Sequence, residues 1–529
     1  MTITPTTDVL IAGAGPTGTA LAIDLARRGV AVRLIDKALH SFDGSRAKGV
    51  QPRTLEILDD LGALPAILEQ GSPYPPMGIH LGAVAIPWRM MAKGERTAAV
   101  PYPDTWLIPQ YSTVRALHAR LETLGGRVEL GTELTDFTVE SGLVTAHLAT
   151  PDGVETVTAR YLVGADGGSS RVRKHLDIEF SGSTDEADRM LIIDAAVTGL
   201  SRKYWHVWPG LRRQFIGACP LPHSDLFQWM IRLAPGEQPP QSHDEISDRI
   251  RSHTHDKRIT LGNIRWLSQF RPNIRLAESY RRGPVFLAGD AAHVHTPAGA
   301  QGLNTGIGDA YNLGWKLAQV LAGADDRLLD TYEAERQPIA AGVLGLSTRK
   351  YEGLGKLDPE SIRRGKDEKQ LSLTYHGGPL AATEKERTAT LRVGDRAPDA
   401  ELLSAEGTRR RLFDIFRGPH FTAIAYGAWA AAELDRLRWP TTGAQLQRLV
   451  IAPGDTAELR SCDALTDPAG AFARTYGLTR DALLLMRPDG YIGHITVNDI
   501  DDIRAAIEAM TPSGPGIPDT SAQNIRPTA

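Results

Sequence analysis

The N-terminal stretch TDVLIAGAGPTGTALAIDLARRG, residues 7–29, constrains the fold more than any other part of this chain. Residues 8–11 are typical of a buried strand, and residues 19–28 have a helical periodicity that ends at Gly29. The turn between them, GAGPTG, carries almost no side-chain bulk. A buried strand, a glycine turn and a helix in direct succession predict an α/β fold.

Each glycine of this turn has a physical role in dinucleotide binding. Gly13 permits the tight turn, Gly15 lets the backbone approach a pyrophosphate, and Gly18 lets the helix pack closely on the strand. The helix N-terminus, which begins near Pro16, directs unpaired N–H groups and a positive dipole end toward the phosphates. A second strand, AVRLID, ends at Asp36, near the spacing at which an acid binds an adenosine ribose. We therefore predict a Rossmann-like dinucleotide-binding domain.

The composition excludes several other classes of protein. A net charge of -4 gives no basic surface for nucleic acid. The predicted strand follows the N-terminus almost at once, and no stretch stays apolar for about 18 residues, so we expect a cytoplasmic protein with no membrane partner. Cys219 and Cys462 are too far apart in sequence for a CxxC pair or a zinc cluster, and we expect no metal site. The chemistry must come from a bound cofactor or from acids and bases.

Three further motifs occur in a fixed order along the chain: SRA at residues 45–47, GADGGSSRVR at residues 164–173, and FLAGDAAHVHTPAGAQGLNTGIGDAYNLGWKLA at residues 286–318. With the glycine turn, they resemble the single-component flavoprotein monooxygenases of group A, the family of para-hydroxybenzoate hydroxylase and of the polyketide and phenol hydroxylases. The resemblance covers roughly residues 7–338. It implies FAD as the cofactor and NADPH or NADH as a transient co-substrate. Because the chain has one strong glycine-rich loop, we expect no second stable dinucleotide site.

The resemblance implies a role for residues in each motif. Asp36 binds the adenosine ribose, although the family usually has Glu there, and Arg46 lies by the FAD pyrophosphate and the flavin. Gln110, in LIPQYSTVRAL, contacts the FAD. Asp166 and Gly167 serve both FAD and NAD(P)H, and Arg173 braces them. This chain has Val114 where the family usually has Glu, so that it lacks a carboxylate at this position.

The resemblance also implies that the long third motif supplies the remaining flavin contacts, as follows. Asp290, which follows Gly289, accepts hydrogen bonds from the ribityl chain. The loop after it lies along the flavin, with Pro297 and Gly299 near the reactive edge. Backbone N–H groups that begin the next helix face the pyrimidine end of the ring, where a helix dipole stabilises the negative charge of reduced flavin. These N–H groups belong to Gly302, Leu303 and Asn304.

The catalytic residues implied by the resemblance are Arg46, Pro297 and His293. A base that deprotonates a phenol suits a histidine whose pKa lies near neutrality, which makes His293 and His295 candidates. The alternative is that these histidines are hydrogen-bonding supports. The chain lacks the WxWxIP stretch of flavin-dependent halogenases, so we expect oxygen transfer and not halogenation.

A substrate domain is predicted at residues 177–282. Segments such as MLIIDAAV, QFIGACPL and LFQWMIRL have strand-like apolar content and favour an antiparallel sheet. Four of its aromatic residues form a candidate wall for a planar substrate, namely Trp205, Phe215, Phe227 and Trp229. The alternative is that most of them are core of the sheet.

The chain continues beyond the hydroxylase-like part. We expect a polar, exposed helical linker at residues 347–392 and then strands such as HFTAIAY and the hairpin LLLMRPDGYIGHI. This pattern resembles the thioredoxin-like C-terminal domain of many polyketide and phenol hydroxylases. GAWAAAEL stands where a redox thioredoxin has CxxC, so the domain has no disulfide exchange to perform and supports packing or a dimer.

The predicted domain order is residues 1–176 and 283–346 for the two parts of the FAD-binding domain, 177–282 for the substrate domain, 347–392 for the linker, 393–512 for the thioredoxin-like domain and 513–529 for a disordered tail. The function implied by the resemblance is hydroxylation of a phenolic or polycyclic aromatic compound by NAD(P)H and O2 through a flavin C4a-hydroperoxide, in a monomer or homodimer. Baeyer-Villiger oxygenation and inactivation of an aromatic antibiotic are alternatives within the same chemistry. A non-catalytic interaction protein similar to GDP-dissociation inhibitors is the alternative from another class.

Overall fold

The computed structural model describes residues 5–82, 84–90, 93–210, 214–296, 300–355, 365, 367–381, 387–454, 464–497 and 501–512, without the side chains of 351–355, 501 and 502. The described part divides into two compact units, one of Met1–Gly314 with Tyr332–Thr374 and one of Trp315–Thr331 with Tyr375–Ala529. The predictions for Pro297, Gly299, Cys462 and the tail at 513–529 fall outside the described residues.

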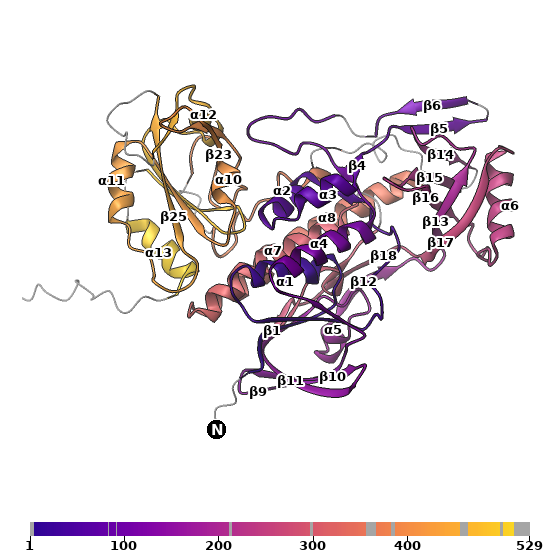
Figure 1. Ribbon diagram of the computed structural model, residues 1–529, viewed down its shortest axis with the longest axis horizontal. Coiled ribbons are helices and arrows are strands. Elements are labelled where there is room, and N and C mark those ends of the chain that lie inside the picture. The colour runs from indigo at the N-terminus through magenta and orange to yellow at the C-terminus, as the bar shows by residue number, and fades with distance from the viewer. Residues whose placement is uncertain are drawn as a thin grey trace, which may run out of the picture. The chain divides into compact units, whose positions relative to one another are not determined.

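The glycine turn follows the central strand of a mixed sheet in the first unit (Figure 1). The strand order is β19-β20-β11-β1-β2-β8, and β10 and β9 continue from β11. β1 runs parallel to β11 and β2, and β11 runs parallel to β20, so their carboxyl ends meet at one edge. The bounds are β1 Thr7–Ala12, β2 Val32–Asp36, β8 Val128–Leu130, β9 Glu133–Glu140, β10 Leu143–Thr150, β11 Gly153–Gly164, β19 Arg281–Arg282 and β20 Val285–Leu287.

This edge collects the predicted motifs, because the glycine turn follows β1, Asp36 ends β2, the Asp166 loop follows β11 and the Asp290 loop follows β20. The predicted Rossmann-like fold is therefore confirmed. Helices and short 3-10 turns pack around the sheet, and α1 lies beside α4 (Figure 1). Their bounds are α1 Pro16–Ala26, α2 Pro52–Asp60, α3 Leu64–Gln70, α4 Gln110–Thr123, α5 Arg171–His175, α7 Gly302–Leu321, α8 Arg327–Gly355, η1 Gly289–Ala291 and η2 Asp367–Lys369.

The predicted substrate sheet is present, with strand order β17-β13-β16-β15-β14-β5-β6. Its pairs are antiparallel except for β14 with β5, which is parallel. β5 and β6 come from the range 1–176 that the sequence assigned to the FAD-binding domain. The substrate sheet therefore includes two strands from outside the predicted range 177–282. The bounds are β5 Met77–Leu81, β6 Val84–Trp88, β13 Met190–Thr198, β14 Trp205–Pro209, β15 Phe215–Pro220, β16 Leu226–Arg232 and β17 Thr260–Phe270, and the helix α6 spans His243–Thr254.

Two small sheets join the flavin and substrate parts of the first unit. In one, β7 pairs with both β3 and β4. In the other, β18 pairs with both β12 and β21. The bounds are β3 Gly49–Val50, β4 Ser72–Pro73, β7 Trp106–Leu107, β12 Phe180–Thr184, β18 Asn273–Ala277 and β21 His293–Val294.

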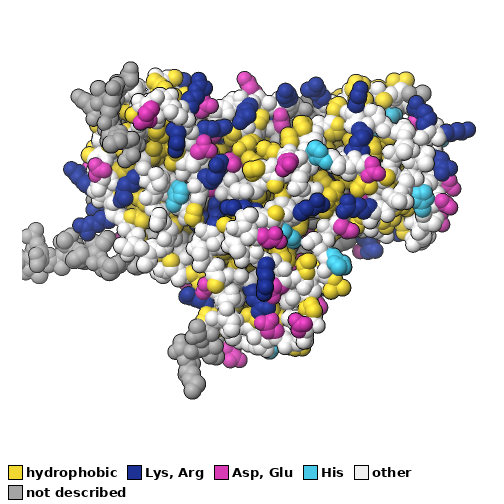
Figure 2. All heavy atoms as spheres, in the orientation of Figure 1, with side chains coloured by type: hydrophobic (Ala, Val, Ile, Leu, Met, Phe, Trp, Pro, Cys, Tyr) yellow, Lys and Arg dark blue, Asp and Glu magenta, His cyan; other side chains and the backbone are white. Residues whose placement is uncertain are grey.

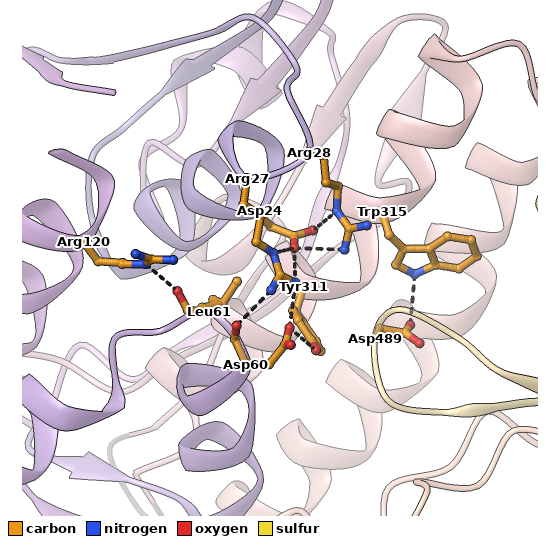
Figure 3. Close-up of polar contacts among 9 residues, drawn as sticks. All are labelled: Asp24, Arg27, Arg28, Asp60, Leu61, Arg120, Tyr311, Trp315 and Asp489. Atoms are coloured by element: carbon orange, nitrogen blue, oxygen red, sulfur yellow. Dashed lines mark hydrogen bonds and ion pairs between the residues drawn. The ribbon is translucent and has the colours of Figure 1, made fainter. Parts of the chain in front are cut away.

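The second unit contains a mixed sheet of order β23-β22-β26-β25-β24-β27-β28. The predicted strand HFTAIAY is β24, and the predicted hairpin is β27 with β28. α11 follows β24 directly and carries no cysteine, and Trp315 donates a hydrogen bond from Nε1 to Asp489 at 3.1 Å within this unit (Figure 3). Its likeness to thioredoxin stays a prediction. The bounds are β22 Glu401–Leu403, β23 Arg409–Arg411, β24 Phe421–Tyr426, β25 Leu446–Pro453, β26 Leu465–Asp467, β27 Ala482–Met486, β28 Ile492–Thr496, α10 Leu412–Phe416, α11 Ala428–Arg436, α12 Ala471–Tyr476 and α13 Asp501–Met510.

The described residues hold no helix that is both long and apolar enough to cross a bilayer. Across the same residues, no group of three or more His, Cys, Asp or Glu side chains is arranged to hold a metal ion. Basic and acidic side chains are interspersed over the face shown in Figure 2.

A buried ion cluster fixes α1 against α2 and α7. Asp24 is fully buried and accepts hydrogen bonds from the guanidinium groups of Arg27 at 2.8 Å and Arg28 at 3.1 Å (Figure 3). Arg27 also pairs with Asp60 at the end of α2 at 2.6 Å, and the hydroxyl of Tyr311 on α7 donates to Asp60 at 2.7 Å. Burial alone would raise the pKa of Asp24, but the two guanidinium groups hold it below its usual range.

We expect Asp24→Asn to lower the free energy of unfolding by about 3–5 kcal/mol, because it leaves buried guanidinium charge without a full partner. A carboxylate with a lowered pKa stabilises the fold above its ordinary pKa of 3.8 and loses this effect as the pH falls through its folded pKa. The difference between wild type and variant should therefore be full at neutral pH and shrink below pH 3.8. Urea unfolding at several pH values measures it, and equal stability at neutral pH contradicts the prediction.

Candidate functional site

The turn after β1 is shaped by close backbone contacts. Gly13 has a φ of +106°, and a Cβ there would lie 2.3 Å from the carbonyl oxygen of Ala165. A Cβ at Gly18 would lie 2.0 Å from the Gly13 carbonyl oxygen, so α1 packs on β1 as closely as the sequence predicts. Around Gly15, a Cβ would meet no described atom within 4 Å, which leaves this backbone open to a ligand. Pro16 begins α1.

Two acids at the sheet edge are oriented by backbone N–H groups. Asp36 accepts from Ala14 at 2.8 Å with one carboxylate oxygen and from Ala38 at 2.9 Å with the other. Asp166 accepts with Oδ2 from Arg171 at the start of α5 at 2.7 Å. Its other oxygen, Oδ1, is buried and has no hydrogen-bond partner among the described residues. A buried carboxylate oxygen of this kind can accept a hydrogen bond from a donor on a ligand.

Arg173 joins the loops that follow β11 and β20. Its guanidinium donates to the carbonyl oxygens of Ala291 at 2.7 Å and Gly168 at 2.8 Å, and it lies 3.8 Å from the ring centroid of Phe180. Gly167, between Asp166 and these contacts, has a φ of +81° that favours glycine. Arg173 therefore braces the Asp166 loop.

The loop after β20 positions Asp290 and leaves its carboxylate without a hydrogen-bond partner among the described residues. Gly289 has a φ of +62°, and a Cβ there would lie 2.5 Å from the hydroxyl of Thr17 in α1. The carboxylate of Asp290 makes no hydrogen bond or ion pair with another residue that the structure describes. It is therefore available to accept from a hydroxyl of a bound ligand.

The N-terminus of α7 is clamped to the strand β3. α7 begins at Gly302, as the sequence predicts for the N–H groups around Leu303. Asn304 accepts with Oδ1 from the N–H of Gln51 at 2.8 Å and donates with Nδ2 to the carbonyl oxygen of Gly49 at 2.9 Å. The first-turn N–H groups of α7, which have no partner within the helix, are thus held in a fixed position.

His293 belongs to a buried charge cluster. The side chain is fully buried, and its Nε2 lies 2.6 Å from Asp309, which also accepts from Arg336 at 2.8 Å and from the N–H of Gly289 at 3.1 Å. Burial would raise the pKa of Asp309, but His293 and Arg336 hold it below its usual range. This arrangement favours the support alternative for His293 over contact with a reacting atom. Burial, and secondly His293, lowers the pKa of His295 to about 3, so that its imidazole is neutral.

Arg46 has a strained backbone that its neighbours hold in place. Its φ of +27° is unusual for a residue with a side chain. The preceding Ser45 donates its N–H to Asp194 at 2.6 Å and its hydroxyl to the same carboxylate. Gln228 donates to the Arg46 carbonyl oxygen at 3.2 Å, and the predicted Gln110 accepts from the N–H of Ala47 at 3.4 Å. The exposed guanidinium of Arg46 makes no hydrogen bond or ion pair with any described residue.

The substrate sheet has two unlike faces. Its outer face packs under α6 and forms a core that includes Phe227 and Trp229, both fully buried. The strand register places a different set on the opposite face, which we call the inner face: Ile192, Asp194, Trp205, Phe215, Gly217, Cys219, Gln228 and Met230. The aromatic wall predicted from sequence is therefore divided. Trp205 and Phe215 lie on the inner face, and the core alternative holds for Phe227 and Trp229.

Sequence reasoning missed the polar residues of the inner face and part of the linker. Asp194 and Gln228 sit within apolar strand segments, and the alternation of those strands was the signal that places them opposite the core. The expectation of an exposed linker is wrong at Glu368 and Gln370, which are buried. Gln370 donates to Gln301 at 2.6 Å, and Glu368 pairs with Lys350 at 2.6 Å, so these polar groups are buried with partners.

The residues at this edge fit FAD. Two helix N-termini, those of α1 and α7, provide N–H groups for a pyrophosphate and for an anionic ring. The open backbone at Gly15, the buried oxygen of Asp166 and the carboxylate of Asp290 provide the room and the acceptors that a dinucleotide with ribose and ribityl hydroxyls requires.

Comparison with known proteins leads to the same cofactor. A family described as an FAD binding domain matches residues 6–347. A flavin-dependent monooxygenase from Mycobacteroides abscessus is 40% identical over 499 residues, which are 92% of this chain and 97% of the relative. The chain belongs to this family of FAD-dependent monooxygenases. The prediction of an enzyme with FAD as its cofactor is confirmed, and the non-catalytic alternative is not supported.

Two further relatives match nearly the whole length of this chain. The pentachlorophenol 4-monooxygenase of Sphingobium chlorophenolicum is 31% identical, with 95% of this chain and 96% of the relative covered. Among solved structures, an anhydrotetracycline hydroxylase from Streptomyces rimosus superposes with a TM-score of 0.73 at 31% identity, covering 96% of this chain and 100% of that one. The resemblance to aromatic and polyketide hydroxylases is thus confirmed at the level of family and fold.

We expect Asp290→Ala to weaken FAD binding about tenfold to a hundredfold, because a hydrogen bond to a charged acceptor contributes roughly 1.5–3 kcal/mol. FAD occupancy after gel filtration and titration of the apoprotein measure the loss. Asp152→Ala, in the turn between β10 and β11, is the matched control and should retain full occupancy. Equal FAD affinity of Asp290→Ala and wild type would remove Asp290 from the ribityl site.

Proposed function

We propose that this monooxygenase hydroxylates a phenolic or polycyclic aromatic substrate that lies over the inner face of the substrate sheet, beside the Arg46 segment. The observation that carries the proposal is the hydrogen bonding of Ser45 and Arg46 to Asp194 and Gln228, which places the flavin-side segment directly against that face. Trp205 on the same face offers a planar apolar contact for an aromatic ring. The names of the pentachlorophenol and anhydrotetracycline relatives support the same substrate class.

Bound FAD supplies the redox chemistry by which NAD(P)H is oxidised and one oxygen atom of O2 is transferred to the aromatic ring of the substrate. The side chains of this chain bind, orient and stabilise. The N-terminus of α7 stabilises negative charge at the pyrimidine end of the ring, and Asp290 fixes the ribityl chain. Asp166 and Arg46 would act on the path of the nicotinamide, and the roles expected of Pro297 and Gly299 fall outside the described residues. His293 acts by holding Asp309 and the loop, in keeping with its burial.

Baeyer-Villiger oxygenation and inactivation of an aromatic antibiotic remain the alternatives, since they need the same cofactor and the same placement of a planar substrate. We propose that the enzyme acts in the cytoplasm, where NAD(P)H is available, as a monomer or homodimer. The second unit is proposed as a thioredoxin-like support without a redox step.

A panel of phenols and tetracyclic phenols tests the function. We expect substrate-dependent NAD(P)H oxidation together with a product heavier by one oxygen atom, which mass spectrometry detects. Analysis of the product separates ring hydroxylation from oxygen insertion next to a carbonyl. Release of hydrogen peroxide equal to the NAD(P)H consumed, with no oxygenated product from any compound, contradicts the proposed substrate class.

The role of Arg46 is tested in the absence of oxygen. We expect Arg46→Ala to slow flavin reduction by NAD(P)H while leaving the unfolding transition in place, because its exposed guanidinium makes no contact with another described residue. Stopped-flow absorbance of the flavin measures the rate. A normal rate at every NAD(P)H concentration would take Arg46 off the nicotinamide path.

A further inference from the structure

Lys48 brings an amine into the interior beside the inner face. The residue is 8% exposed, and Gln228 Oε1 accepts a hydrogen bond from its Nζ. Among the described residues, no carboxylate lies within ion-pair distance of this amine. Its Nζ also lies 4.8 Å from the ring centroid of Trp205. A buried amine without an ion pair is costly in its charged form unless a ligand provides the negative charge.

Lys48 lies between the substrate sheet and the loop that precedes α7. The next residue, Gly49, accepts from Asn304 at the start of α7, and a Cβ on Gly49 would lie 2.9 Å from the Cβ of Ala300. The backbone at Lys48 therefore lies against the loop that the sequence places along the flavin. The side chain extends the other way, to Gln228 and Trp205 on the inner face.

The surrounding contacts fix the direction of the amine and leave donors for a ligand. Gln228 uses its amide nitrogen for Ser45 and for the Arg46 carbonyl oxygen, so its amide oxygen is directed at Lys48. An amine or ammonium has more than one N–H, and Gln228 accepts one of them. The acidic groups that act on Lys48 are Asp194, whose carboxylate is bound by Ser45, and the buried thiol of Cys219. Burial lowers the pKa of Lys48.

We propose that Lys48 is the residue that binds the acidic hydroxyl of the substrate, a phenol or an enol conjugated with the ring, and holds it as the anion. The inference rests on the proposed function and names the chemical feature that the site selects. The hydroxyl loses its proton to water, and the resulting phenolate pairs with the ammonium of Lys48, so that the buried positive charge gains a partner. The ring gains electron density, which suits an acceptor of an electrophilic oxygen atom, and Trp205 flanks the pair.

The test compares a phenol with its methyl ether, which has the same ring but no acidic proton. The probes are pentachlorophenol and pentachloroanisole, and binding to the FAD-loaded enzyme is read from the flavin absorbance spectrum. We expect wild type to prefer the phenol, and Lys48→Met to bind the phenol about tenfold or more weakly while binding the ether as before. Lys203→Met removes an exposed lysine of the same substrate domain and should keep the wild-type preference.

A purely structural role of Lys48 would leave the preference for phenol over ether unchanged. An unchanged preference in Lys48→Met with full FAD content overturns the proposal. Lys48→Gln, which still donates to Gln228, decides the matter if the Met variant loses FAD or does not fold, and loss of folded holoenzyme in both variants makes Lys48 structural and also overturns it. If wild type binds neither probe nor any phenol of the activity panel, the proposed function fails and this inference fails with it. If wild type binds and hydroxylates phenols while the variants keep the preference, this inference alone is wrong.

Discussion

Close backbone approaches that only glycine permits hold the cofactor-binding motifs together. Gly13 packs on the backbone of Ala165, Gly18 packs on the carbonyl of Gly13, and Gly289 packs on Thr17 of α1. Each contact joins the glycine turn to a loop at the carboxyl end of another strand, or to the helix that follows the turn. Because a Cβ at any of these positions would meet an atom at 2.5 Å or less, a larger side chain would separate the loops that must bind one dinucleotide. The parallel register of β1, β2, β11 and β20 then sets where those loops meet.

Buried carboxylates fix the two helices whose N-termini face the FAD site. Asp24 joins α1 to α2 through Arg27, and the hydroxyl of Tyr311 ties α7 to Asp60 in the same cluster (Figure 3). Asp309, also on α7, holds His293, Arg336 and the N–H of Gly289. Such pairs offer little net stability over apolar packing, but removing one partner is costly, so they act mainly to define one arrangement. A site that depends on the direction of helix dipoles requires helices with a fixed orientation, and these ion pairs provide it.

The segment from Ser45 to Gly49 is held by contacts from two parts of the first unit. Its backbone is held on one side by Asp194 and Gln228 of the substrate sheet and on the other by Gln110 and Asn304 of the flavin part. The strained φ of Arg46 persists because these contacts over-determine it. Lys48, in the same segment, directs its amine at Gln228 and Trp205 of the inner face.

The sequence by itself determined the elements with strong local signals: the strand, glycine turn and helix at residues 7–29, the start of α7 near Leu303, and the antiparallel strands of the substrate sheet. These follow from periodicity and from the conformational freedom of glycine, which are properties of neighbouring residues. Tertiary structure decided which face of each strand turns toward the site. Phe227 and Trp229 became core while Asp194 and Gln228 reached Ser45, and β5 joined a sheet formed mainly by strands that follow it by more than a hundred residues. Alternation identifies two faces of a strand but not which partner covers each, because that depends on contacts between residues distant in the sequence.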